Sequence, residues 1–154
     1  MHGTEFEKRV DEIVAKYPQA KAAMLPVLWE CQNASGWIDK PTEDWVAERL
    51  GVSSAHVHGC VTFYTMFKQR KMGKYHIQLC TTLSCMLRGC DNIQEHLQNK
   101  LGIKPGEVTP DGRFSLVQVE CLGSCGTAPM FQLNDDYHED LTIEKIDALL
   151  DGLE

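Results

Sequence analysis

The chain of 154 residues lacks the features of several common protein classes. Its longest apolar runs fall well short of the roughly 20 residues that a membrane span needs, so we expect no direct membrane insertion. The first residues, MHGTEFEKRV, contain no apolar signal-peptide segment, which predicts a cytoplasmic protein. Basic residues are in deficit, with 15 Lys and Arg against 22 Asp and Glu and a net charge of −7. Such a chain would be repelled by a phosphate backbone, and we therefore expect no nucleic-acid partner.

Signatures of catalysis on a bound substrate are also missing from the sequence. It contains neither a glycine-rich phosphate loop at a strand–helix junction nor a nucleophile elbow. His56 and His58 occur in the segment HVHG, but a spacing of two places them on different faces of a helix. We interpret both as solvated histidines. The chain alone is therefore predicted to carry no complete active site.

The apolar residues of the first half recur at helical spacing. A first helix ends at Pro18, a second runs from about Gln19 to Asn33, a third opens at Pro41, and Ser53 caps a fourth. Helices this short, with little connecting loop, form a small bundle. We predict an N-terminal helical bundle over residues 1–70, with the three tryptophans in its core: Trp29, Trp37 and Trp45.

The period changes from helical to alternating after a charged link at residues 69–74. A strand is predicted from Tyr75 to Cys80, followed by a long helix that ends at Gly102. Two strands, Phe114 to Glu120 and Met130 to Asn134, and a last helix capped by Thr142 complete the chain. This order is typical of a compact α+β or thioredoxin-like domain in which helices cover a mixed sheet. We predict the α+β class, with a second domain at residues 74–154.

Seven cysteines are the most informative residues, because in a reducing compartment metal or redox chemistry explains them better than disulfides. Four of them form two pairs, Cys80-x4-Cys85 and Cys121-x3-Cys125, each at the end of a predicted strand. Two loops at one end of a sheet can hold one metal centre. The spacing favours a [2Fe–2S] cluster, with a structural Zn²⁺ in an interaction module as the alternative.

The residues between the paired cysteines favour the cluster. Gly123 and Gly126 allow the backbone to approach closely, and N–H groups of such loops can point at cluster sulfurs. Hydroxyl groups in the first loop offer the same contact, on Thr81, Thr82 and Ser84. The remaining cysteines fall on predicted helices and are interpreted as packed thiols: Cys31, Cys60 and Cys90.

Nearly the whole chain resembles the small [2Fe–2S] subunits in the flavoprotein arm of respiratory complex I, the NADH:quinone oxidoreductase. Relatives of these subunits serve NAD-linked hydrogenases and formate dehydrogenases. The most specific segments are VAERLGVSSAHVHGCVTFYTMF, HIQLCTTLSCMLRGC and FSLVQVECLGSCGTAPMFQLND. On these motifs the family's cluster ligands fall on Cys80, Cys85, Cys121 and Cys125.

The resemblance implies a helical bundle followed by a thioredoxin-like ferredoxin domain that holds one [2Fe–2S] cluster. It implies an electron-transfer role as a subunit of an NADH:quinone oxidoreductase, on the cytoplasmic face of the membrane. The constant partner would be the flavoprotein subunit, which carries FMN and binds NADH. Alternatives are a subunit of an NAD-linked hydrogenase or formate dehydrogenase, and a free-standing ferredoxin.

The segment TFYTMF, residues 62–67, contains three aromatic residues and a methionine. Phe63 and Phe67 lie one helical turn apart, which predicts that they pack between the two halves of the chain. Tyr64 and Met66 would then point outward, and such side chains are enriched at the centres of interfaces. The resemblance places this segment near the flavoprotein. We therefore predict that Tyr64 and Met66 contact that partner.

Overall fold

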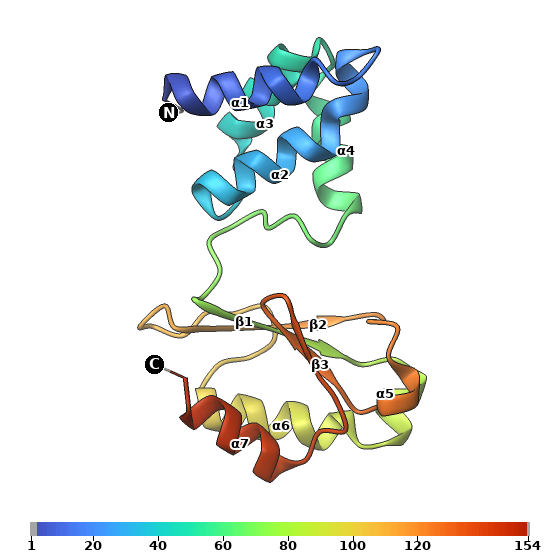
Figure 1. The fold of residues 1–154 in the computed structure, drawn as a ribbon. Coiled ribbons are helices and arrows are strands. Elements are labelled where there is room, and N and C mark those ends of the chain that lie inside the picture. Colours follow the sequence, from blue (N-terminus) through green and yellow to red (C-terminus); the bar gives the residue numbers. More distant parts are fainter. Residues whose placement is uncertain (1–2, 154) are drawn as a thin grey trace. The chain divides into compact units, whose positions relative to one another are not determined.

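Figure 1 shows the computed structural model of the chain, in which residues 3–153 are described. The chain divides into two compact units, with the division between Lys71 and Met72. The first unit is helical and the second combines a sheet with helices, which confirms the predicted α+β class. Across residues 3–153, every helix is too short or too polar to cross a membrane.

Helix-end signals in the sequence account for the elements of the first unit. These elements are α1 (Thr4–Val14), η1 (Ala20–Ala23), α2 (Met24–Ser35), α3 (Lys40–Leu50) and α4 (Ser54–Phe63). Gly36 and Gly51 end α2 and α3 in the left-handed conformation, which glycine adopts without a steric penalty. The hydroxyl of Ser53 accepts the N–H of His56 and caps α4, as predicted.

Aliphatic side chains, rather than tryptophans, form the core of the first unit. Val10, Val27 and Leu28 are fully buried there, whereas Trp29 is 41% exposed. Trp37 and Trp45 are only half-buried, with Trp45 at the edge of the core against Phe6. The predicted tryptophan core is therefore wrong. An indole is too large to be enclosed easily between short helices, and valine and leucine fill that space instead.

The TFYTMF segment does not continue the fourth helix. Because α4 ends at Phe63, Phe63 and Phe67 do not share a helix face. Phe67 is buried in the core of the bundle, but Phe63 is 76% exposed, so its predicted packing role is wrong. Tyr64 and Met66 are exposed, as predicted. Together with Trp29 they give the first unit a group of exposed large apolar side chains.

The second unit contains a four-stranded mixed sheet in the order β2-β1-β3-β4. The strands are β1 (Tyr75–Cys80), β2 (Phe114–Val119), β3 (Phe131–Leu133) and β4 (Asp136–His138). β1 pairs parallel with β2 and antiparallel with β3, which confirms the predicted mixed sheet. Helices α6 (Cys90–Leu101) and α7 (Ile143–Asp151) cover one face (Figure 1). Their apolar residues pack on that face against Ile77, Leu79, Leu116 and Phe131.

The predicted long helix after β1 is instead two helices, α5 (Leu83–Leu87) and α6. Gly89 separates them with a φ of +89°, a conformation that a right-handed helix cannot continue through. Met86, on α5, is 50% exposed, whereas Cys90 is fully buried at the start of α6. Because of this break, Cys85 lies in a short helix that is separate from α6.

Gly73 fits closely against β2 where the chain enters β1. A Cβ atom at Gly73 would lie 2.4 Å from the carbonyl carbon of Phe114, much closer than two carbon atoms can approach. The N–H of Gly73 donates to Ser115 Oγ over 3.1 Å. Ser115 Oγ also lies 2.8 Å from Nδ1 of the buried His76. Glycine therefore allows this close pairing of β1 with β2.

Candidate metal centre

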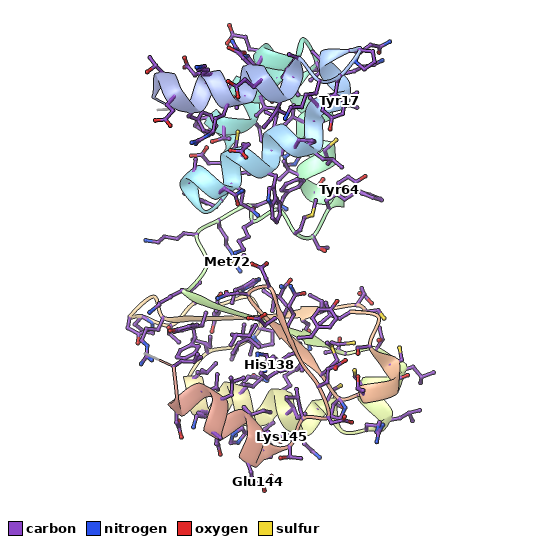
Figure 2. All side chains as sticks on the ribbon, viewed as in Figure 1. Tyr17, Tyr64, Met72, His138, Glu144 and Lys145 are labelled. Carbon is purple, nitrogen blue, oxygen red and sulfur yellow. The ribbon has the colours of Figure 1, made fainter. Side chains whose placement is uncertain are left out.

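The four cysteines predicted as ligands lie at one end of the sheet. β1 and β2 are parallel neighbours, so their carboxyl ends reach the same edge. Cys80 is the last residue of β1, and its Sγ lies 3.7 Å from the carbonyl oxygen of Glu120, the residue before Cys121. In Figure 2, sulfur atoms gather beside α5 in this part of the second unit. The fold thus brings the two cysteine loops together.

Short helical turns hold the second cysteine of each pair. Cys85 lies within α5, and Cys125 opens the 3-10 helix η2 (Cys125–Thr127). These two turns are in contact. Cys80 and Cys85 are buried, whereas Cys121 and Cys125 are exposed. A group held by all four thiols would therefore be enclosed on the α5 side and open to the surface on the other.

Hydrogen-bond donors in both loops approach the sulfur atoms. The hydroxyl of Thr82 lies 3.4 Å from Cys80 Sγ, and the N–H of Gly123 donates to Cys121 Sγ over 3.4 Å. Gly123 has a φ of +80°, which favours glycine at this turn. Thr81 differs from the prediction, because its hydroxyl donates to the carbonyl of Val119. Donors of this kind stabilise charge on thiolate sulfur.

The buried pair has opposite shifts of its thiol pKa values. Burial raises the pKa of Cys80, but hydrogen bonds from the hydroxyl and N–H of Thr82 and from the N–H of Leu122 outweigh it, and the pKa falls below its usual value. Burial and the neighbouring Cys80 raise the pKa of Cys85 to about 11, although a hydrogen bond from the N–H of Met130 acts to lower it. The donors from Thr82 and Leu122 therefore favour the thiolate form of Cys80.

Cys90 lies closer to the site than its position in the sequence indicated. It is fully buried in one apolar group with Cys80, Cys85, Ala128 and Met130. Burial, followed by the nearby carboxylate of Asp91, raises its pKa. The prediction that it is a packed thiol is confirmed. Cys31 is likewise packed, in the core of the first unit, and burial raises its pKa to about 12. Cys60, on α4, is half-buried.

The thiols and their donors fit the chemistry of a [2Fe–2S] cluster. Four cysteine thiolates are its usual ligand set, and loops with N–H and O–H groups near sulfur are its usual surroundings. In residues 3–153, no three His, Cys, Asp or Glu side chains are close enough to surround a single ion. The fit to the cluster rests on the four thiols and on the donors from Thr82 and Gly123.

Sequence reasoning missed the segment that binds the second cysteine loop. Residues 137–140, here called the latch, comprise the last two residues of β4 and the two residues that follow it. The hydroxyl of Tyr137 donates to the carbonyl of Leu122 over 2.8 Å, and the N–H of Asp140 donates to the carbonyl of Thr127 over 2.7 Å. Between them, the carboxylate of Glu139 accepts hydrogen bonds from the loop, from Ser124 and Thr127. These contacts join segments that are separated in the sequence, so they become visible only in the folded structure.

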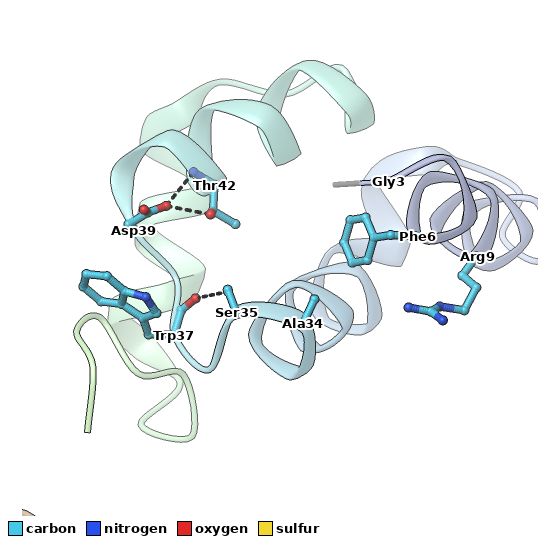
Figure 3. A pocket seen from close by; sticks show the side chains of 8 residues that line it. All are labelled: Gly3, Phe6, Arg9, Ala34, Ser35, Trp37, Asp39 and Thr42. Atoms are coloured by element: carbon cyan, nitrogen blue, oxygen red, sulfur yellow. Dashed lines mark hydrogen bonds between the residues drawn. The ribbon is translucent and has the colours of Figure 1, made fainter. Parts of the chain in front are cut away.

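The first unit contains a pocket of about 270 Å³ whose polar groups serve structural contacts (Figure 3). Asp39 Oδ1 accepts the N–H and the hydroxyl of Thr42 over 3.0 and 2.6 Å, which caps α3. The hydroxyl of Ser35 donates to the carbonyl of Trp37 over 2.6 Å. Capping and turn formation thus account for these groups, and the pocket offers no arrangement typical of catalysis among the described residues.

The sequence pattern of the thioredoxin-like [2Fe–2S] ferredoxin family matches residues 10–154. The chain belongs to this family, which confirms the resemblance inferred from the cysteine motifs. A relative from Rickettsia bellii, named as a subunit of NADH-quinone oxidoreductase, is 47% identical over 96% of this chain and 93% of its own length. "NADH-quinone oxidoreductase subunit 2" of Thermus thermophilus is 45% identical over 94% of this chain and 81% of its own length.

Two further comparisons involve longer chains. "NADH dehydrogenase [ubiquinone] flavoprotein 2, mitochondrial" of Dictyostelium discoideum is 43% identical over 94% of this chain and 60% of its own length. A solved structure of an NAD⁺-reducing [NiFe]-hydrogenase in the air-oxidised state has a TM-score of 0.72. It is 22% identical, over 83% of this chain and 22% of that chain. This likeness shows a shared fold.

Proposed function

We propose that the chain is an electron-transfer subunit of a complex I type NADH dehydrogenase assembly. In this proposal one [2Fe–2S] cluster is held by Cys80, Cys85, Cys121 and Cys125. The main supporting observation is the meeting of the two cysteine loops at one edge of the sheet, where Cys80 Sγ lies 3.7 Å from the carbonyl oxygen of Glu120. Such a cluster, when bound, accepts and releases one electron.

The residues around the site have distinct parts in this function. Cys80 and Cys85 would hold the cluster from the buried side, and Cys121 and Cys125 from the exposed side. Donation from the Gly123 N–H to sulfur stabilises the negative charge that the ligands share. On the exposed side, an electron donor or acceptor could approach the cluster closely.

The remaining chemistry of such an assembly belongs to a partner in this proposal. A larger flavoprotein subunit would carry FMN and bind NADH, because the sequence has no glycine-rich dinucleotide loop. The names of the relatives described above, all NADH-quinone oxidoreductase or NADH dehydrogenase proteins, support this placement. The assembly would lie at the cytoplasmic face of the membrane, and the exposed Tyr64 and Met66 are proposed contacts of the flavoprotein.

Co-purification at native expression tests the subunit assignment. We expect a tagged chain to recover one flavoprotein in a one-to-one ratio, with FMN bound and NADH-oxidising activity. If the chain is instead recovered with hydrogenase or formate dehydrogenase subunits, it would be assigned to one of those assemblies. A chain that stays a monomer under conditions that preserve large complexes would contradict the subunit assignment and support a free-standing ferredoxin.

A further inference from the structure

Glu139 binds the loop that carries the last candidate ligand. Thr127 Oγ1 donates to Glu139 Oε1 over 2.6 Å, and the hydroxyl of Ser124 donates to the same oxygen. The two hydroxyl oxygens lie 2.7 Å apart. Because each hydroxyl has a single proton, one shared carboxylate oxygen can satisfy both. Ser124 directly precedes Cys125 and Thr127 follows it by two residues, so the contact spans this cysteine.

We propose that Glu139 is a positioning residue that fixes the Cys125 loop and lowers the reduction potential of the cluster bound there. This inference rests on the cluster assignment in the proposed function. It goes beyond that assignment, because Glu139 is not a ligand and lies 14 residues after Cys125 in the sequence. Its two effects have different physical origins, one from hydrogen bonding and one from charge.

The hydrogen bonds matter because the second loop is exposed at its candidate ligands and contains two glycines. Cys121, Cys125 and Gly126 are exposed, and glycines at positions 123 and 126 give the backbone unusual freedom. The flanking contacts of the latch, from Tyr137 to Leu122 and from Asp140 to Thr127, align Glu139 with the loop. The carboxylate then keeps the two sides of Cys125 together. Without it, we expect the loop to open and the exposed thiolate to leave iron more readily.

The charge matters because reduction adds an electron to a site that is already negative. An oxidised [2Fe–2S] cluster with four thiolates has a formal charge of about −2. A carboxylate against the loop of one ligand disfavours the added electron by Coulomb repulsion. Lys145, on α7, donates its Nζ to the carbonyl oxygen of Asp140 over 2.7 Å rather than to the carboxylate of Glu139. The negative charge of Glu139 therefore favours the oxidised cluster.

Two substitutions separate the two effects. Glu139→Gln keeps an acceptor oxygen for both hydroxyls but removes the charge, whereas Glu139→Ala removes both. Glu107→Gln is the matched control, because it removes one negative charge beside Leu116, in the middle of β2, rather than beside the cysteine loops. Glu107 Oε2 accepts the N–H of Lys104 over 2.7 Å, and glutamine retains that acceptor too.

The test is a redox titration of the cluster-loaded full chain, followed by its visible absorption and its EPR signal. For Glu139→Gln we expect a reduction potential that is more positive by up to about 59 mV. For one electron, this equals a tenfold change in the ratio of reduced to oxidised cluster at a given solution potential. Glu107→Gln should titrate as the wild type does. Equal potentials for Glu139→Gln and the wild type would overturn the charge effect.

Cluster retention tests the hydrogen-bonding effect. In excess chelator, we expect Glu139→Ala to lose its absorption severalfold faster than the wild type, and Glu139→Gln to lose it at nearly the wild-type rate. The double variant Ser124→Ala, Thr127→Val keeps the charge and removes both donors, so it should also lose the cluster faster. Wild-type rates in both Glu139→Ala and the double variant would overturn the positioning role.

The outcomes also separate this inference from the proposed function. A wild-type chain that binds no iron and no sulfide would overturn the proposed function together with this inference. A wild-type chain that holds the cluster, with variants of unchanged potential and retention, would overturn the role of Glu139 alone.

Discussion

Replacement of Gly73 by alanine tests the close pairing of β1 with β2 that places the cysteine loops at one edge. The new Cβ would lie 2.4 Å from the carbonyl carbon of Phe114 and 2.8 Å from its Cα and carbonyl oxygen. All three are backbone atoms, so no side-chain rotation can relieve the clash. The start of β1 must then move away from β2.

The cost of this movement follows from the contacts that it disturbs. Overpacking of this kind costs about 1–3 kcal/mol, and a lost hydrogen bond adds about 1 kcal/mol. The hydrogen bonds at risk are those from Gly73 to Ser115, at 3.1 Å, and from Tyr75 to Arg113, at 2.7 Å. We therefore expect a destabilisation of about 2–4 kcal/mol. For a unit of this size, that lowers the melting temperature by roughly 10–30 °C.

Thermal melting of the full chain, together with amide hydrogen exchange of β1 and β2, measures the effect. Exchange is needed because it reports the second unit separately from the first. Gly59→Ala is the control: Gly59 lies within α4, and an added Cβ meets nothing within 4 Å. It should stabilise the first unit by about 0.5–1 kcal/mol. If Gly73→Ala leaves the protection of β1 and β2 unchanged, the described packing of these strands is wrong.

Three further predictions concern the site and its partner. Cys90→Ala should keep the cluster spectrum, whereas Cys85→Ala should abolish or remodel it; loss of the cluster in Cys90→Ala would make Cys90 a ligand. Tyr64→Ala should weaken assembly with the flavoprotein, while Tyr17→Ala, which removes an equally exposed tyrosine (38% for both), should not. Unchanged assembly of Tyr64→Ala would move the interface elsewhere. The isolated chain should have a potential below that of the NAD couple, because its four thiolates and acidic composition disfavour reduction; full reduction by NADH alone would contradict this.

The sequence predicted those parts of the fold that depend on local signals. The caps formed by Ser53 and Thr142, and the helix end at Gly102, lie where expected. Each depends on a few neighbouring residues, either through a side-chain acceptor or through glycine's access to positive φ. The alternating pattern likewise predicted a strand from Tyr75 to Cys80, and β1 has these bounds, with Ile77 and Leu79 in the core.

Features that depend on long-range contacts were not predicted. The break at Gly89 was hidden because Met86, Cys90 and Ile93 keep a helical spacing through it. The buried Glu43 was missed because its partner, Nδ1 of His58, lies 2.9 Å away on another helix. The predicted solvation of His58 agrees with its side chain, which is 57% exposed although it binds Glu43.

The candidate site divides in the same way. The spacing of the cysteine pairs and the glycines of the second loop indicated four thiols in one place, and the fold brings the two loops to one edge of the sheet. Glu139 carried no such signal, because a single glutamate after a turn resembles any surface residue until the latch is seen against the loop. Burial, which distinguishes Cys80 and Cys85 from Cys121 and Cys125, also depends on the whole fold.

Metal analysis of the anaerobically purified chain tests the central claim most directly. The measurement is the content of iron, acid-labile sulfide and zinc per chain, with the visible spectrum of the same sample. We expect a red-brown protein with two iron and two sulfide ions per chain, lost together on replacement of Cys80 or Cys125 by alanine. A colourless protein that contains stoichiometric zinc and no sulfide would contradict the account and make the chain a zinc-stabilised interaction module.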